Sequence, residues 1–147
     1  MAGVPVHLPV SIEIKTYFHH TTLDGLSKIL QSGYIKQSTI TTNDAVYGAG
    51  TYLTSYGPEK SQWDVAINNY DGCKNKFAEQ MLKSGKTDAI IAVDLPTSSV
   101  TKPDPYRDIY VYPEDIIIAG KNPRFYVRNK DGTATEISPA EILKLVP

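Results

Sequence analysis

Two histidines, His19 and His20, stand next to each other in the string Phe-His-His-Thr-Thr. An imidazole can bind a metal ion or exchange a proton near neutral pH. Neighbouring residues on an extended segment point to opposite sides, so the two rings cannot easily share one ion. The third histidine, His7, lies in an unpatterned segment, and no paired-cysteine or His-Glu-x-x-His spacing completes a zinc site. We therefore expect no metal site.

A second stretch of interest runs from Asp44 to Ser55, with the sequence DAVYGAGTYLTS. It places Gly48 and Gly50 inside a run of Val, Tyr, Thr and Leu, where glycine marks a tight bend or a close backbone approach. One interpretation is a loop that turns into a strand beside a ligand, and the other is a hairpin corner in an ordinary sheet. Spacing alone favours the hairpin, because a lone Gly-x-Gly is weak evidence.

Length and composition limit the possible classes of protein. A chain of 147 residues with 41% hydrophobic content predicts one globular domain over residues 1–147. The net charge of -1 gives no broad attraction to nucleic acid or acidic membranes. Cys73 is the sole cysteine, which excludes an intrachain disulfide. The sequence has no leader pattern and no run of membrane-spanning length. We expect a soluble, cytoplasmic monomer, with secretion by a non-classical route as the alternative.

The elements that must position these residues follow from periodicity and turn chemistry. Residues 10–18 alternate as a strand does, and the apolar run 89–95 is typical of a strand buried in mid-sheet. Further strands are expected at 109–112, 116–119, 125–128 and 133–137, the last two joined by an Asp131-Gly132 hairpin turn, and a loop is expected over 34–43. The expected helices begin at the Thr21-x-x-Asp24 capping box, at Pro58, at Lys74 and at the Ser138-Pro139-Ala140-Glu141 capping box, and the first of them ends at Gly33. Strands outnumber helices without strict alternation, which predicts an α+β fold with mostly antiparallel pairing.

Three stretches become informative when they are taken together. A strand ends in Phe-His-His-Thr at residue 21, YGAGTYLTS follows, and Asp108 directly precedes the strand letters IYVY. This order resembles the diphtheria-toxin-like and poly(ADP-ribose) polymerase branch of the ADP-ribosyltransferase superfamily, which carries a His-Tyr-Glu triad. Here the triad reads His19, Tyr52 and Asp108, similar to the small domains with a His-Tyr-Asp signature. The resemblance spans about residues 17–118.

The resemblance implies an NAD cleft between two small antiparallel sheets, without a Rossmann glycine fingerprint. In it His19 would bond a hydroxyl of the adenosine ribose, and Tyr52 would stack on the nicotinamide ring. The backbone of His20 and the hydroxyl of Ser61 would hold the carboxamide, while Trp63 would cover the other face of the ring. The predicted cofactor contacts are completed by Thr21, Tyr47, Gly48 and Gly50.

The implied reaction is cleavage of the bond between nicotinamide and ribose through an oxocarbenium-like transition state. A carboxylate at Asp108 would stabilise the growing positive charge and help deprotonate an acceptor. Because aspartate is one methylene shorter than the usual glutamate, we expect transfer of a single ADP-ribose, or hydrolysis, in place of polymer synthesis. NAD would be the donor substrate, and the acceptor is left open as a protein, nucleic acid or small molecule.

Other functions remain open at this point. An NAD glycohydrolase, or a noncatalytic module that binds NAD, ADP-ribose or a partner protein, would use the same fold, because fold does not guarantee function. Each triad residue also has a structural interpretation: His19 as a satisfied core histidine, Tyr52 as a strand aromatic, and Asp108 as a capping or surface carboxylate. Asp115 is a shifted alternative to Asp108.

Overall fold

The central feature of the computed structural model, which describes residues 12–39, 47–71 and 75–146, is a four-stranded antiparallel sheet. Its strand order is β1-β4-β7-β8, with β1 at Ile14–Thr21, β4 at Ala89–Pro96, β7 at Arg124–Arg128 and β8 at Ala134–Glu136. Two short antiparallel pairs accompany it: β2 (Tyr34–Ile35) with β6 (Ile116–Ile117), and β3 (Thr51–Leu53) with β5 (Tyr110–Tyr112).

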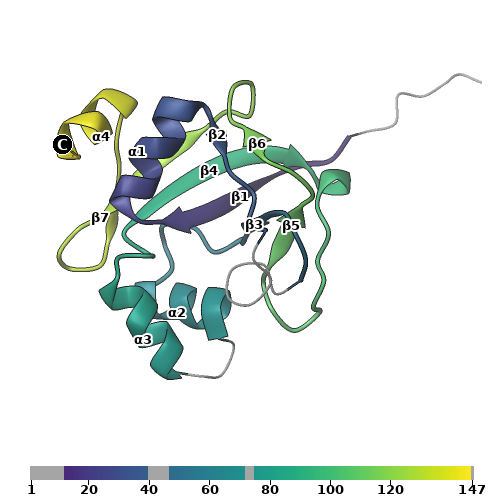
Figure 1. The fold of residues 1–147 in the computed structure, drawn as a ribbon, viewed down its shortest axis with the longest axis horizontal. Helices are drawn as coiled ribbons and strands as arrows, with labels where there is room; N and C mark the ends of the chain where they lie inside the picture. The colour runs from purple at the N-terminus through teal and green to yellow at the C-terminus, as the bar shows by residue number, and fades with distance from the viewer. Residues whose placement is uncertain (1–11, 40–46, 72–74, 147) are drawn as a thin grey trace, which may run out of the picture.

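Helices lie on both faces of the large sheet (Figure 1). They are α1 (Leu23–Ser32), α2 (Gln62–Ala66), α3 (Asn75–Lys83) and α4 (Pro139–Leu145), with a π-helical turn η1 (Ile67–Asp71) after α2 and a 3-10 turn η2 (Thr97–Ser99) after β4. The expected α+β class with antiparallel pairing is confirmed. No helix within the described residues is long and apolar enough to cross a membrane.

The strand β4 organises the core, as its apolar sequence predicts. It pairs with β1 along its whole length and with β7 over residues 89–92, so it lies inside the sheet. Its side chains alternate: Ile91 and Val93 join Leu26 of α1 in the main cluster, whereas Ile90 is buried on the opposite face. The strand is therefore buried on both faces, which accounts for its continuous apolar run.

Two predicted helix starts are wrong, that of α1 by one residue and that of α2 by four. The N-cap of α1 is Thr22, which accepts from Gly25 N at 2.9 Å, because pairing with β4 continues to Thr21 and keeps that residue extended. The helix α2 begins after Ser61, not at Pro58, which forms a turn. The ends were predicted better, since Gly33 closes α1 in the left-handed region with φ 85°.

Two strand bounds also need correction. The strand predicted at 10–18 begins at Ile14 and continues through both histidines to Thr21; residues 1–11 lie outside the described part of the chain. The stretch predicted as a loop after Gly33 contains β2, whose two residues pair with β6. Such a short strand leaves no periodicity in the sequence to find it by.

Candidate active site

The strands β1 and β3 meet at one backbone bridge, and the first candidate residues lie directly beyond it. Phe18 N donates to Thr54 O at 2.8 Å, and Thr54 N donates to Phe18 O at 2.9 Å. Within the described residues this is the only β-bridge between the two strands. Next to it, His19 Nδ1 lies 2.9 Å from the backbone oxygen of Tyr52. The first two members of the predicted triad are therefore in contact.

The protonation state of His19 follows from this contact. A carbonyl oxygen only accepts, so Nδ1 carries the proton and Nε2 has a free lone pair. Burial lowers the pKa of His19, against a smaller opposing effect of the bond to Tyr52. The neutral imidazole thus presents an acceptor nitrogen.

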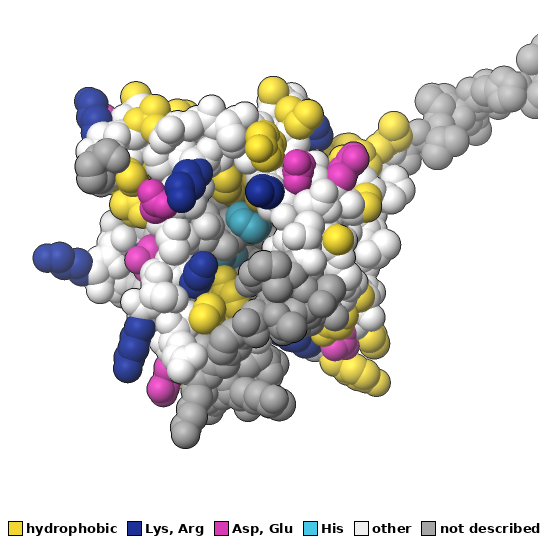
Figure 2. Space-filling view, viewed as in Figure 1, with side chains coloured by type: hydrophobic (Ala, Val, Ile, Leu, Met, Phe, Trp, Pro, Cys, Tyr) yellow, Lys and Arg dark blue, Asp and Glu magenta, His cyan; other side chains and the backbone are white. Residues whose placement is uncertain are grey.

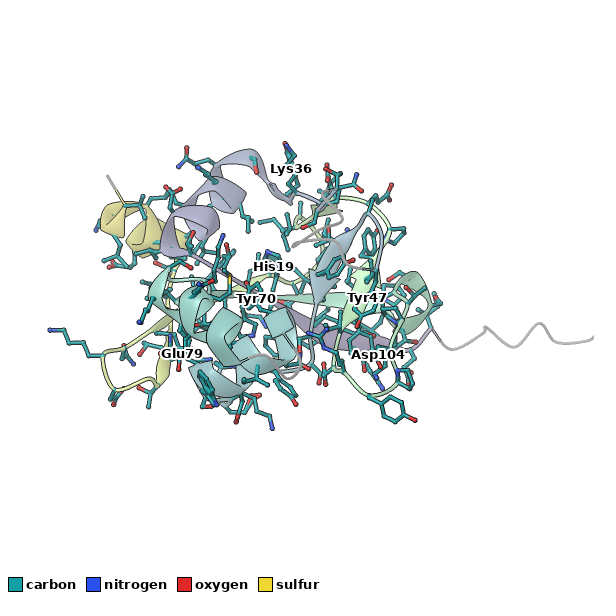
Figure 3. All side chains as sticks on the ribbon, turned by 60° about the horizontal axis from the view of Figure 1, so that its bottom comes forward. His19, Lys36, Tyr47, Tyr70, Glu79 and Asp104 are labelled. Carbon is teal, nitrogen blue, oxygen red and sulfur yellow. The ribbon has the colours of Figure 1, made fainter. Side chains whose placement is uncertain are left out.

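A cleft of about 240 Å³ opens at this point, and a histidine side chain is visible in the hollow of Figure 2. The cleft is lined by His19, His20, Thr21, Ser38, Tyr52, Asn69, Tyr70 and Lys86. A second cavity of about 330 Å³ shares His19 and Thr21 with it and is lined further by residues of α1 and β2, together with Lys36. Figure 3 shows His19 between Lys36 and Tyr70.

The charged side chains that line the two cavities, among the described residues, are all lysines. Lys86 lines the first, and Lys28 and Lys36 line the second, whereas no Asp or Glu among the described residues lines either one. Lys28 also forms an exposed ion pair with Asp24 at 3.0 Å. The region around His19 therefore favours an anionic ligand.

The ring of Tyr52 is held in one orientation at the cleft wall. Its hydroxyl accepts from Tyr47 N at 2.7 Å and donates to Gly48 O at 2.8 Å. The ring of Tyr47 stacks on it, with centroids 6.4 Å apart and an interplanar angle of 22°. Both hydrogen bonds of the hydroxyl go to the Tyr47–Gly48 backbone and hold it in place. The aromatic ring is therefore the part of this side chain that can contact a ligand.

The glycine pair has a clear structural role. Gly50 has φ 155°, and a Cβ on it would lie 2.5 Å from Val111 Cγ1 and 2.6 Å from Tyr112 O. Its backbone also bonds Ser38 in both directions, at 2.8 and 3.0 Å. The close approach predicted from the sequence is therefore an approach to β5. Gly48, with φ 101°, shapes the turn that receives the Tyr52 hydroxyl.

Asp108 is anchored at the end of β3, just before β5 begins. Its Oδ1 accepts from Thr54 Oγ1 at 2.9 Å and from Ser55 N at 2.6 Å, and its Oδ2 accepts from Ser55 Oγ. The carboxylate is thus fixed beside the strand that carries Tyr52, but it does not line the cleft with His19. Asp115 has a different task, since its carboxylate accepts from Gln37 N at 2.8 Å.

His20 points away from His19, as neighbouring strand residues do. Its side chain is buried, and Nε2 donates to Tyr56 O, 2.7 Å away. Its Nδ1 is buried with no partner among the described residues. Burial lowers the pKa of His20 to about 4, with Arg128 and His19 acting in the same direction.

Ser61 and Trp63 do not join the predicted set. Ser61 caps α2 by accepting from Asp64 N at 3.0 Å, and Trp63 lines a separate cavity. The π-helical turn after α2 brings Asn69 and Tyr70 into the cleft instead. Neither residue was predicted from the sequence to line the site, because a π turn changes the direction of the side chains that follow it.

Within the described residues, no group of three or more His, Cys, Asp or Glu side chains could hold a metal ion. Comparison of the chain with protein-family models, with curated proteins and with solved structures finds no match.

Proposed function

We propose that this chain binds NAD in the cleft at His19 and Tyr52, cleaves the bond between nicotinamide and ribose, and transfers one ADP-ribose to an acceptor. The proposal rests on the contact between His19 and Tyr52: Nδ1 of His19 lies 2.9 Å from the backbone oxygen of Tyr52, and both residues line a cleft together with Lys86. Their order along the chain is the one that the resemblance implies. Asp108 is anchored at the end of the same strand, β3.

The nicotinamide end would lie at the edge of β1. Phe18 turns its backbone groups toward Thr54, and alternate residues of a strand point their backbone groups to the same edge. The backbone N–H and C=O of His20 therefore point to the same edge of β1 as those of Phe18. Beyond the Phe18–Thr54 bridge, this edge has no further pairing with β3 in the described residues. A carboxamide offers one acceptor and one donor group, so it can bond an N–H and a C=O together. The ring would then stack on Tyr52.

The remainder of the donor would follow the basic side of the cleft. Nε2 of His19 is an acceptor suited to a ribose hydroxyl. A diphosphate carries negative charge and would be attracted by Lys86, Lys36 and Lys28. The absence of lining carboxylates in the described residues removes the repulsion that an acidic side chain would add.

Asp108 would act on the developing charge. Positive charge grows on the ribose as nicotinamide leaves, and a fixed carboxylate near it lowers the barrier. Its hydrogen bonds to Thr54 and Ser55 hold the carboxylate in one orientation, so little reorganisation is needed.

The test uses NAD with label in the adenosine part, incubated with the protein and a cell lysate. Nicotinamide release and labelled product are measured for wild type, for Asp108→Asn, and for Asp131→Asn as an exposed aspartate control. We expect Asp108→Asn to lose about 100-fold or more in nicotinamide release. Equal turnover by the Asp108 variant and wild type would refute the proposal.

A noncatalytic NAD-binding or ADP-ribose-binding module is the second candidate. The observation that favours it is that, among the described residues, no carboxylate lines the His19 cleft. This candidate predicts that NAD raises the melting temperature without any release of nicotinamide. An NAD glycohydrolase would instead release nicotinamide and label no macromolecule.

A further inference from the structure

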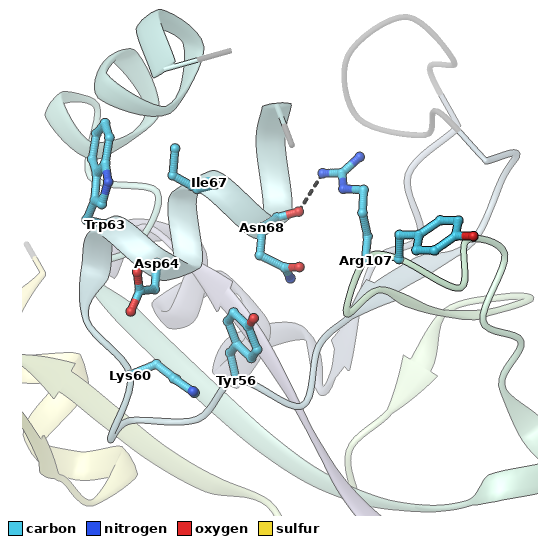
Figure 4. A pocket seen from close by; sticks show the side chains of 8 residues that line it. Tyr56, Lys60, Trp63, Asp64, Ile67, Asn68 and Arg107 are labelled. Carbon is cyan, nitrogen blue, oxygen red and sulfur yellow. Dashed lines mark hydrogen bonds between the residues drawn. The ribbon is translucent and has the colours of Figure 1, made fainter. Parts of the chain in front are cut away.

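Figure 4 shows a third cavity, of about 480 Å³, from close by. Its walls include the aromatic residues Tyr56, Trp63 and Tyr106 and the cationic residues Lys60 and Arg107. None of these residues lines the cleft at His19. The cavity is therefore separate from the proposed donor site.

Hydrogen bonds join this cavity to the donor cleft. Asn68, in the cavity wall, donates from Nδ2 to Oδ1 of Asn69, in the cleft wall, over 3.1 Å. His20 Nε2 donates to the backbone oxygen of Tyr56 over 2.7 Å. Asn68 also accepts from the backbone N of Asp108 at 3.0 Å. Asp108 lines neither space itself, but its backbone is held by Asn68 of the cavity wall.

Exposed aromatic rings are the main feature of the cavity. Trp63 is 39% exposed and Tyr106 is 94% exposed, so both rings present apolar surface to solvent. Exposed rings of this kind form stacking surfaces for nucleobases, because every base has a flat π-face. The amine of Lys60 lies 4.9 Å from the centroid of the Tyr56 ring.

The charges of the cavity favour an anion. Lys60 and Arg107 contribute two cations, against one carboxylate from Asp64. The guanidinium of Arg107 donates to Asn68 O and, over 3.3 Å, to the hydroxyl of Tyr47, while its Nε is buried with no partner among the described residues. This excess of positive charge disfavours a peptide rich in Lys or Arg and suits a phosphate next to a stacked base.

We propose that this cavity binds a nucleobase of a single-stranded nucleic acid as the acceptor of ADP-ribose, an inference that rests on the proposed function. A base inside a duplex cannot stack on these rings, so the substrate is unpaired. In the step, a base nitrogen or oxygen bonds C1′ of the NAD ribose as the bond to nicotinamide breaks. Nicotinamide leaves with the bonding electron pair, and the proton of the base passes to water.

Binding is tested first, without NAD. Trp63 is the only tryptophan of the chain, so its fluorescence reports this cavity alone. A mixed-sequence single-stranded oligonucleotide should quench it, whereas heparin, a polyanion without bases, should not. By anisotropy of a labelled oligonucleotide, Trp63→Ala should weaken binding about tenfold. Lys60→Ala should reduce the salt dependence, and Lys130→Ala, an exposed lysine control, should leave it unchanged. Absence of quenching, or equal quenching by heparin, would overturn the inference.

Transfer is tested next, with NAD and the same oligonucleotide, by mass spectrometry of the strand. Gain of one ADP-ribose supports the inference. Nicotinamide release with modification of a basic peptide, and not of the oligonucleotide, overturns it while the proposed function stands. If the oligonucleotide binds at Trp63 but no nicotinamide is released under any condition, the proposed function fails and the cavity is a nucleic-acid-binding site without transfer.

Discussion

The side chain of Asn68 brackets the backbone of Asp108: Nδ2 donates to Asp108 O at 2.7 Å, and Oδ1 accepts from Asp108 N at 3.0 Å. One amide thus satisfies both backbone groups of Asp108, as a neighbouring strand would. Because Asn68 belongs to the π-helical turn after α2, that turn sets the position of the proposed catalytic carboxylate. The helical side of the molecule and the strand β5 are coupled at this residue.

The first prediction concerns this bracket. Asn68→Ala removes both bonds and should lower nicotinamide release by at least tenfold, together with a loss of about 1–2 kcal/mol in unfolding free energy. Asn129→Ala is the matched control, since its amide bonds Thr133 and Thr135, each at 2.9 Å, in the distant β7–β8 turn. Urea unfolding and turnover are measured for both. Equal turnover of the two variants would contradict a positioning role for Asn68.

The second prediction separates the two ring nitrogens of His19. In His19→Asn the amide can still donate to Tyr52 O, as Nδ1 does, but no group replaces the acceptor Nε2. We expect the unfolding free energy to change by less than about 1 kcal/mol and the affinity for NAD to fall about tenfold, the value of one lost hydrogen bond. Isothermal titration with NAD measures the affinity, and unchanged affinity would remove His19 from the donor site.

The third prediction tests the close approach at Gly50. Gly50→Ala places a methyl group against Val111 and the backbone of Tyr112, and backbone cannot move aside as a flexible side chain can. The expected loss is about 2–4 kcal/mol in unfolding free energy. Gly120 also has a positive φ, 78°, but a Cβ there would meet nothing within 4 Å, so Gly120→Ala should lose only about 1 kcal/mol. A loss of unfolding free energy for Gly50→Ala no larger than that for Gly120→Ala would contradict the clash.

The fourth prediction is a loss of stability on acidification. The pKa of His20 is about 4 in the folded chain, because of burial, against 6.5 in the unfolded chain. Between these values the unfolded chain binds more protons, so the contribution of His20 is complete above pH 6.5 and falls as the pH drops toward 4. The slope is about 1.4 kcal/mol per pH unit for one proton, and burial of His19 acts in the same direction.

Urea unfolding at several pH values between 7 and 4 measures this slope. His20→Gln lacks the titrating group, so its unfolding free energy should be lower at pH 7 but should fall less steeply with acid. A variant with the same slope as wild type would show that His20 is not the group responsible.

Local sequence patterns were enough to predict several elements of the fold. The apolar run after Asp88 predicted β4 to within one residue, and Gly33 predicted the end of α1, because glycine alone adopts its positive φ without strain. The Asp131-Gly132 pair predicted the turn between β7 and β8. Such features depend on neighbours along the chain, which a sequence displays directly.

By itself the sequence determined the α+β class, the central strand and the order of His19, Tyr52 and Asp108 along the chain. Only the tertiary structure decided which of these residues share a space. It brings His19 to the backbone of Tyr52, anchors Asp108 on Ser55 outside the cleft, and places Trp63 in a separate cavity. The physical reason is that contact between distant residues depends on strand register and on the π-helical turn after α2. Neither leaves a periodic pattern in the sequence.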